Sequence, residues 1–153
     1  MTYFVYVSVK GEDKINVYSM DDAGSLELKH EVALAGGPSG IALAPNRGFL
    51  YVALRDRSEL ASLSINRLDG SISLLGSIEE ESDSVYITVD RSGKFVLTSS
   101  NGGARASSYR IGENGALVAP AASTVHTLQG AHSVEVHPSN RFVYVPHCIR
   151  QNA

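Results

Sequence analysis

The segment Gly37-Pro-Ser-Gly-Ile-Ala-Leu-Ala-Pro-Asn-Arg-Gly-Phe-Leu-Tyr-Val-Ala-Leu-Arg55 holds two apolar runs separated by a turn. In the first run, Ile41 and Leu43 alternate with small residues, and the second run extends from Phe49 to Leu54. The Pro-Asn-Arg-Gly sequence between them is typical of a chain reversal, because these residues readily adopt turn geometry. The segment therefore predicts a β-hairpin.

This hairpin recurs along the chain. Related segments occupy residues 85–100 and 133–146, and the chain opens with a copy of the second strand, Phe4-Val-Tyr-Val7. The aromatic residue that begins this strand recurs at steps of 45, 46 and 47 residues, at Phe4, Phe49, Phe95 and Phe142. A fixed period of this length indicates a repeat architecture.

Two further strands are predicted between successive hairpins. They span residues 15–20 and 25–32, then 60–66 and 71–78, then 106–111 and 116–119. A turn glycine separates the members of each pair, at Gly24, Gly70 and Gly115, and supplies the positive φ of a tight turn. Each repeat is thus predicted to hold four antiparallel strands, named A to D here. Strand A spans residues 40–44, 85–90 and 133–137, and strand B starts at the recurring phenylalanine.

A four-stranded unit repeated every 40 to 50 residues is typical of a β-propeller blade. We therefore expect an all-β chain in which residues 1–153 form one partial propeller with no second domain. The chain begins at strand B of one blade and ends after strand B of another. About three blades are therefore present, where closed propellers have roughly four to eight. The missing blades would come from a longer chain, from the other piece of a cleaved chain, or from further copies. A longer chain is favoured, because open blade edges promote aggregation.

Composition excludes several partners. A net charge of −3, from 13 basic and 16 acidic residues, gives no reason to expect nucleic acid or a membrane surface. No apolar run could span a bilayer, and the N-terminus lacks a signal peptide. The single cysteine, Cys148, favours a reducing compartment, so a cytoplasmic protein is expected. Neither histidine spacing nor carboxylate clustering indicates a metal site, and no cofactor motif is present.

Strand order decides where chemistry can occur. Because strands alternate in direction, the D–A loops and the B–C loops lie on one face, around the innermost strands A. The D–A loops are residues 35–40, 79–84 and 127–132, and the B–C loops are residues 10–14, 55–59, 101–105 and 147 onward. Polar residues of these loops are the candidates for binding and catalysis. His137 replaces a turn aspartate and is expected on the opposite face.

His132 and Arg55 are the leading candidates. His132 stands at the mouth of a strand A, where its imidazole could act as general acid or base, or could only hydrogen-bond a neighbouring loop. Arg55 ends a strand B, and its guanidinium could hold a carboxylate or phosphate. The alternative for Arg55 is a surface ion pair with Asp56 or Glu59.

The same loops contain weaker candidates for the binding site. Asn101, Gly102 and Gly103 could offer amide and backbone N–H groups to an anion, or could form only a turn. His147 and Arg150 lie in the last B–C loop and could join His132. The acidic run at residues 79–83 is expected to be solvated rather than metal-binding.

These repeats resemble the lactonase family of seven-bladed propellers, which includes cycloisomerase-type 6-phosphogluconolactonases and carboxy-cis,cis-muconate cyclases. The resemblance covers all 153 residues as the N-terminal half of a member. It rests on the order of these motifs: Tyr6-Val-Ser, Ile15-Asn-Val-Tyr18, Gly36-Gly-Pro-Ser39, Ala44–Val52, Ile87–Phe95, Ser100-Asn-Gly-Gly103 and His132–Pro146. The chain departs from the family at Ser100-Asn, where members often have Asn-Tyr, and so lacks an aromatic near the expected pocket.

The resemblance implies about three of seven blades and a lactone-processing enzyme. It implicates His132 in catalysis and favours hydrolysis of 6-phosphogluconolactone, with carboxy-cis,cis-muconate cycloisomerisation as the alternative. In either reaction the substrate is a small anionic lactone or carboxylate. Further arginine and glutamate residues would come from later blades, so the chain alone is expected to be inactive. A non-enzymatic propeller that binds a protein partner is a separate alternative.

Overall fold

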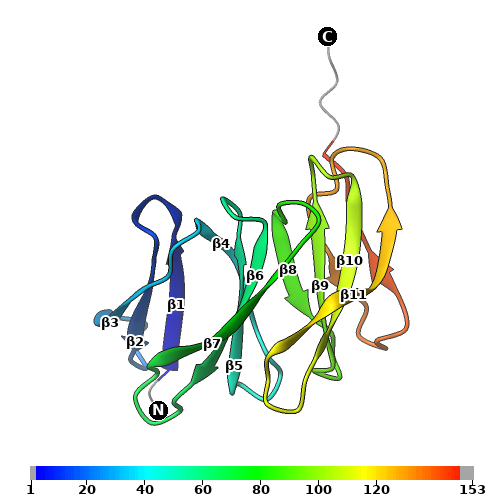
Figure 1. Cartoon of the computed structure of the whole chain (residues 1–153). Coiled ribbons are helices and arrows are strands. Elements are labelled where there is room, and N and C mark those ends of the chain that lie inside the picture. The colour runs from blue at the N-terminus through cyan, green and yellow to red at the C-terminus, as the bar shows by residue number, and fades with distance from the viewer. Residues whose placement is uncertain (1–2, 149–153) are drawn as a thin grey trace.

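The computed structural model describes residues 3–148, which form four antiparallel sheets (Figure 1). The first sheet contains β1 (Tyr3–Val9), β2 (Lys14–Met20) and β3 (Leu26–Ala33). The second contains β4 (Pro38–Leu43), β5 (Phe49–Leu54), β6 (Glu59–Ile65) and β7 (Ile72–Glu79). The third contains β8 (Tyr86–Val89), β9 (Phe95–Ser100), β10 (Arg105–Ile111) and β11 (Leu117–His126), and the fourth β12 (Glu135–Val136) and β13 (Val143–Tyr144). One 3-10 turn, η1 (Lys10–Glu12), is the helical element of this part of the chain, and no helix there could cross a membrane.

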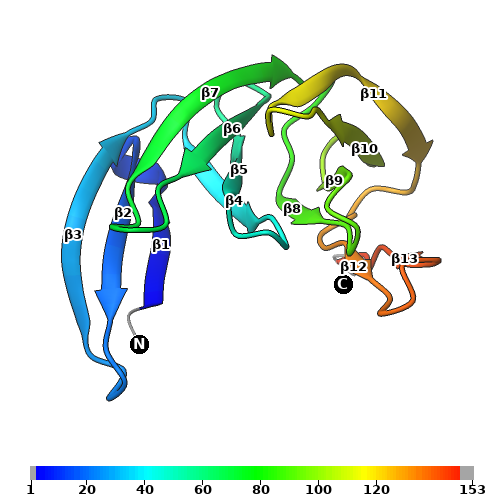
Figure 2. The same cartoon turned by 90° about the horizontal axis from the view of Figure 1, so that it is seen from below.

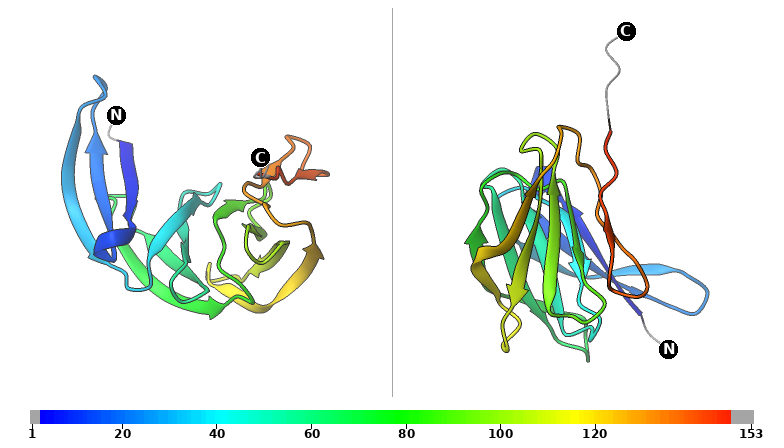
Figure 3. Two further views of the ribbon diagram at one scale, coloured as in Figure 1. Left: turned by 90° about the horizontal axis from the view of Figure 1, so that it is seen from above. Right: turned by 90° about the vertical axis from the view of Figure 1, so that its right-hand side faces the viewer.

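The sheets follow one another as propeller blades. In the second and third sheets the strands lie side by side in the order β4-β5-β6-β7 and β8-β9-β10-β11, which are the predicted strands A to D. Figure 2 shows the sheets along an arc, with β3, β7 and β11 on its outer side and β4 and β8 on its inner side. The left view in Figure 3 shows the same arc from above. The prediction of four-stranded propeller blades is confirmed.

Two predicted strand boundaries were wrong. The strand expected at residues 116–119 continues as β11 to His126, past Pro120. Because β11 is the edge strand of its sheet, a proline there need not interrupt a ladder of hydrogen bonds. The strand expected at residues 133–137 is reduced to β12, in which Glu135 and Val136 pair with β13.

The core lies between blades. Leu50, Val52 and Leu54 of β5 pack into the cluster shared by the first two sheets. Tyr51 and Ala53 point the other way, into the cluster shared with the third sheet. Successive side chains of a strand face opposite sides. Burial of both faces therefore explains why this strand is a continuous apolar run rather than an alternating one.

A repeated contact joins the first blade to the second and the second to the third. The hydroxyl of Tyr6 donates a hydrogen bond to the carbonyl oxygen of Gly70 at 3.0 Å, and Tyr51 does the same to Gly115 at 3.0 Å. A Cβ on Gly70 would overlap the ring of Phe4, so only glycine allows this approach. Gly70 and Gly115 keep the period of the aromatic residues because they contact Phe4 and Phe49 across these two interfaces.

A second repeated contact holds the loops of one face together. Each of the three complete B–C loops ends on a residue with left-handed backbone, at Asp13, Ser58 and Ala104. The carbonyl oxygens of these residues accept hydrogen bonds from the first D–A residue, at Leu34 (2.7 Å), Glu80 (2.8 Å) and Thr127 (2.8 Å). The two kinds of loop therefore share one face, as predicted.

Candidate functional site

The candidate site lies on the face that carries the D–A and B–C loops. These loops form the upper edge of the ribbon in Figure 1. The predicted site residues fall into two groups on this face. One surrounds Arg55, at the end of β5, and the other surrounds His132, between β11 and β12.

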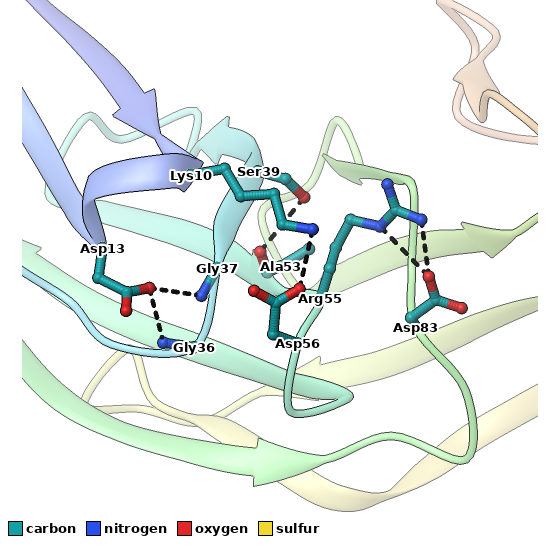
Figure 4. A network of polar contacts seen from close by, with 9 residues as sticks. All are labelled: Lys10, Asp13, Gly36, Gly37, Ser39, Ala53, Arg55, Asp56 and Asp83. Atoms are coloured by element: carbon teal, nitrogen blue, oxygen red, sulfur yellow. Dashed lines mark hydrogen bonds and ion pairs between the residues drawn. The ribbon is translucent and has the colours of Figure 1, made fainter.

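Arg55 is held by a carboxylate that sequence analysis did not select. Its Nε and Nη2 donate to Oδ2 of Asp83 at 3.3 and 2.7 Å, and its side chain is 35% exposed (Figure 4). The alternative of an ion pair at Arg55 is thus realised, but its partner is neither Asp56 nor Glu59. Asp56 pairs with Nζ of Lys10 at 2.8 Å, and Glu59 accepts a hydrogen bond from a serine of β7. The reason is geometric, since the loop that follows β7 brings Asp83 to the guanidinium.

The carboxylate of Asp13 binds the backbone of Gly36 and Gly37. Its Oδ1 accepts the backbone N–H groups of Gly36 at 3.1 Å and Gly37 at 2.8 Å (Figure 4). Gly37 has φ +69°, and a Cβ there would meet the carboxylate of Asp56. The Gly-Gly sequence is therefore required by the close packing of this loop, and its N–H groups are already used by the protein.

The acidic loop is solvated only in part, since Glu79 and Glu81 are exposed as predicted but Glu80 is not. Glu80 is partly buried, and its Oε1 accepts hydrogen bonds from Ser84 Oγ at 2.8 Å and Thr98 Oγ1 at 3.1 Å. Burial raises the pKa of Glu80, although these hydrogen bonds oppose the shift. Glu81 pairs with Arg105. The loop packs over β9 and β10 of the next blade, so its carboxylates find partners there.

The turn after β9 contains the predicted amide and N–H donors. Asn101 is half-buried, and its carbonyl oxygen accepts a hydrogen bond from the N–H of Gly130 at 3.2 Å. Gly102 is exposed. The N–H of Gly103 donates to Ser100 Oγ at 3.0 Å, so it is already engaged. The Asn101 amide and the Gly102 N–H are the groups of this turn that a ligand could reach.

His132 and His147 lie on neighbouring segments. The bridge between Ala131 and His147 pairs the two segments, and the N–H of His132 donates to the Pro146 carbonyl oxygen at 3.0 Å. The side chains of both histidines are exposed. Nδ1 of His147 lies 2.9 Å from the carbonyl oxygen of Val145, while the ring of His132 has no hydrogen-bond partner among residues 3–148. Arg150 lies outside the described residues.

The structure thus places the predicted residues in two groups. Within the described ranges, no hydrogen bond or ion pair joins Arg55 to His132 directly. Lys10, Asp13 and Asp83 were not predicted as site residues, although they lie in the D–A and B–C loops predicted on this face. Their charge was the available signal, but their pairing depends on contacts between loops. In residues 3–148, no three His, Cys, Asp or Glu side chains gather as a metal site would require.

His137 occupies the turn position predicted for it. Its Nδ1 lies 2.8 Å from Ser139 Oγ, just as Asp90 Oδ2 accepts from Ser92 Oγ one blade earlier. The hairpin turns that carry these contacts join strands A to strands B, at the end of the sheets away from the D–A and B–C loops. His137 is therefore a turn residue on the opposite face.

Four-stranded antiparallel sheets repeated along an arc, with polar loops gathered on one face, define the chain as part of a β-propeller. Residues 10–148 match the family described as Lactonase, 7-bladed beta-propeller, and the chain belongs to that family.

Individual relatives agree with this assignment. The chain is 31% identical over 152 residues to a 6-phosphogluconolactonase of Serratia proteamaculans, covering 99% of the chain and 45% of the relative. It is 28% identical to a 6-phosphogluconolactonase of Pectobacterium carotovorum, again covering 99% of the chain and 45% of the relative. The chain thus spans just under half the length of these curated relatives.

Solved structures share the fold. A protein from Lactobacillus plantarum superposes with a TM-score of 0.82 at 20% identity, covering 99% of this chain and 49% of its own. The periplasmic gluconolactonase of Pseudomonas aeruginosa gives a TM-score of 0.82 at 18% identity, covering 96% of this chain and 47% of its own. At these identities the similarity establishes the propeller fold alone.

Proposed function

We propose that the protein to which this chain contributes hydrolyses a lactone, with 6-phosphogluconolactone as the substrate. The family match over residues 10–148 carries this proposal. The identity to 6-phosphogluconolactonases along nearly the whole chain supports the choice of substrate. The chain supplies one part of the site, and the remaining blades supply the rest.

In this proposal His132 performs the proton transfers. Its exposed ring, at the mouth of the inner strands, is open to water and substrate. As general base, the imidazole takes a proton from water while the water oxygen bonds to the lactone carbonyl carbon. As general acid, the resulting imidazolium returns the proton to the ring oxygen as the bond between the carbonyl carbon and that oxygen breaks. Water is thereby added across the ester bond, and a hydroxy acid is released.

Arg55 holds the negative charge of the substrate. Asp83 engages Nε and Nη2, and no bond within the described residues involves Nη1. The guanidinium can therefore keep its carboxylate partner and still donate to a phosphate or to the developing oxyanion. The Asn101 amide and the Gly102 N–H of the third blade and His147 of the fourth would complete the contacts with the substrate. Arg150 stays a predicted contact outside the described residues.

The proposal is tested with the complete protein that carries this chain, by measuring release of 6-phosphogluconate from the lactone. General acid–base catalysis contributes roughly 100-fold or more, so His132→Asn should lose at least that factor in kcat with its fold retained. His137→Asn is the matched control, because His137 lies on the opposite face, and it should keep wild-type turnover. Turnover of His132→Asn equal to wild type would remove His132 from the mechanism.

The alternatives predict other results. A carboxy-cis,cis-muconate cycloisomerase would leave 6-phosphogluconolactone intact and convert the muconate instead. A propeller that only binds a protein would turn over neither substrate. A cytoplasmic location and the treatment of residues 1–153 as a single partial propeller domain stay predictions.

A further inference from the structure

The loop between β7 and β8 is anchored by a buried carboxyl group. Oε1 of Glu80 accepts hydrogen bonds from Ser84 at the far end of the loop and from Thr98 on β9 of the next blade. Its backbone N–H donates to the carbonyl oxygen of Ser58 at 2.8 Å. Glu80 thus ties the loop to its own blade and to the following one.

Burying the Glu80 carboxyl group costs free energy of folding. Oε2 of Glu80 is buried and accepts no well-aligned hydrogen bond among the described residues, although the Tyr109 hydroxyl of β10 lies near the carboxyl group. Leaving a buried oxygen unpaired costs free energy that an apolar side chain of similar size would avoid. A carboxyl group at this position is therefore better explained by the loop geometry that it imposes than by stability.

The residues that follow Glu80 reach both groups of the candidate site. On one side, Asp83 holds the guanidinium of Arg55 at 2.7 Å. On the other side, Ser82 packs so closely on Gly103 that a Cβ there would overlap its hydroxyl group. The same turn carries Asn101, whose carbonyl oxygen binds the N–H of Gly130, two residues before His132. The loop is thus the link between the two groups.

We propose that Glu80 is a positioning residue of the anion site, which fixes the loop so that Asp83 holds Arg55 and Ser82 supports the turn at Asn101. The inference rests on the proposed function and deepens it. Without the carboxyl group, the loop loses the acceptor of both side-chain hydrogen bonds. Asp83 then no longer has a fixed place, and the partly exposed Arg55 side chain samples other rotamers. Binding an anion must then order Arg55 again, so affinity falls.

The experiment follows the Arg55 Nε–H signal in proton–nitrogen NMR spectra of the complete protein that carries this chain, assigned with Arg55→Lys. In Glu80→Ala the signal should shift or broaden. In Glu80→Gln, which keeps an acceptor oxygen, it should return toward the wild-type position. Glu79→Ala is the matched control, since that exposed carboxylate precedes the loop, and it should leave the signal unchanged. An unchanged Arg55 signal in folded Glu80→Ala would overturn the proposal.

A second variant covers the case in which Glu80→Ala does not fold. Thr98→Val removes one of the two hydrogen bonds to Oε1 and should move the Arg55 signal in the same direction by a smaller amount. An unmoved signal in folded Thr98→Val would count against the proposal in the same way.

Titration of the complete protein that carries this chain with 6-phosphogluconate separates this inference from the proposed function. In the wild type the Arg55 signal should respond to the ligand, and Glu80→Ala should bind it roughly tenfold more weakly, with recovery in Glu80→Gln. If the wild type shows no response, the proposed function fails. The effect of Glu80→Ala on the ligand-free Arg55 signal still decides the positioning role.

Discussion

Tyr51 donates a hydrogen bond to the carbonyl oxygen of Gly115, 64 positions further along the chain, across the interface between two blades. Tyr6 and Gly70 repeat the contact one blade earlier with the same separation. Burial raises the pKa of Tyr51 to about 12, so the hydroxyl remains a donor at all ordinary pH values. This hydrogen bond is a specific polar contact between blades that otherwise pack through apolar side chains.

Tyr51→Phe should destabilise the chain by about 1 to 2 kcal/mol, because it leaves the buried Gly115 carbonyl oxygen without its partner. Urea denaturation followed by circular dichroism measures the change. Tyr144→Phe is the control, since Tyr144 is 55% exposed, and it should shift the free energy of unfolding by less than about 0.5 kcal/mol. Equal stabilities of the two variants would mean that the hydrogen bond contributes nothing.

Gly115→Ala should be much more damaging than Gly24→Ala. Both glycines have nearly the same backbone, with φ of +84° and +82°, so alanine is strained at each by about 1 to 2 kcal/mol. At Gly115, however, a Cβ would overlap the ring of Phe49, whereas nothing lies near it at Gly24. Overpacking should add about 1 to 3 kcal/mol at Gly115 alone. Similar unfolding midpoints for the two variants would show that the ring moves aside freely.

Most of the fold could be predicted because short sequence patterns mark each repeat. Turn glycines and the aromatic start of strand B give the period and the strand order directly. The predicted ends of two strands were wrong. The strand expected to end at Ala119 continues through Pro120 to His126, and its position at a sheet edge makes this continuation possible.

The candidate site could be predicted only in part. The face that carries Arg55, Asn101 and His132 follows from strand order, which a sequence supplies. The partner of Arg55 does not follow from strand order. Asp83 is 28 residues away in the sequence, and the loop after β7 brings it to the guanidinium. The alternative partners offered for Arg55, Asp56 and Glu59, are the charges nearest to it in the sequence, whereas packing between loops pairs it with Asp83.

Asp90→Asn should lower stability at neutral pH. Burial alone would raise the pKa of Asp90, but hydrogen bonds from Ser92, Asn140 and the Phe95 N–H outweigh it and lower the pKa from 3.8 to about 2. A depressed pKa contributes stability above the unfolded value, which is lost as pH falls through the folded value. The variant should be destabilised by about 2 kcal/mol at neutral pH, with the difference shrinking between about pH 4 and pH 2. Urea denaturation across this range tests it, and a pH-independent difference would contradict it.

Glu80→Gln should show the opposite pH dependence. Desolvation by burial raises the pKa of Glu80 above its usual 4.5, so the folded state favours the protonated form. Stability from this group is fully present below the unfolded pKa and is lost as pH rises through the folded one. Gln stays neutral, so the variant should gain stability relative to wild type between about pH 4 and about pH 8. Denaturation curves at both pH values measure this, and Glu79→Gln, an exposed neighbour, should show no such trend.

Arg55→Lys should weaken binding of 6-phosphogluconate although it conserves the charge. Arg55 binds Asp83 through Nε and Nη2 of its planar guanidinium. Lysine has a single ammonium group instead, so the Asp83 carboxylate and the ligand would compete for it. Loss of a charge-assisted hydrogen bond predicts roughly tenfold weaker binding, measured by isothermal titration calorimetry. Arg57→Lys, an exposed arginine in the same loop, should bind as the wild type does. If both variants bind equally well, the guanidinium serves Asp83 alone and the anion site lies elsewhere on the face.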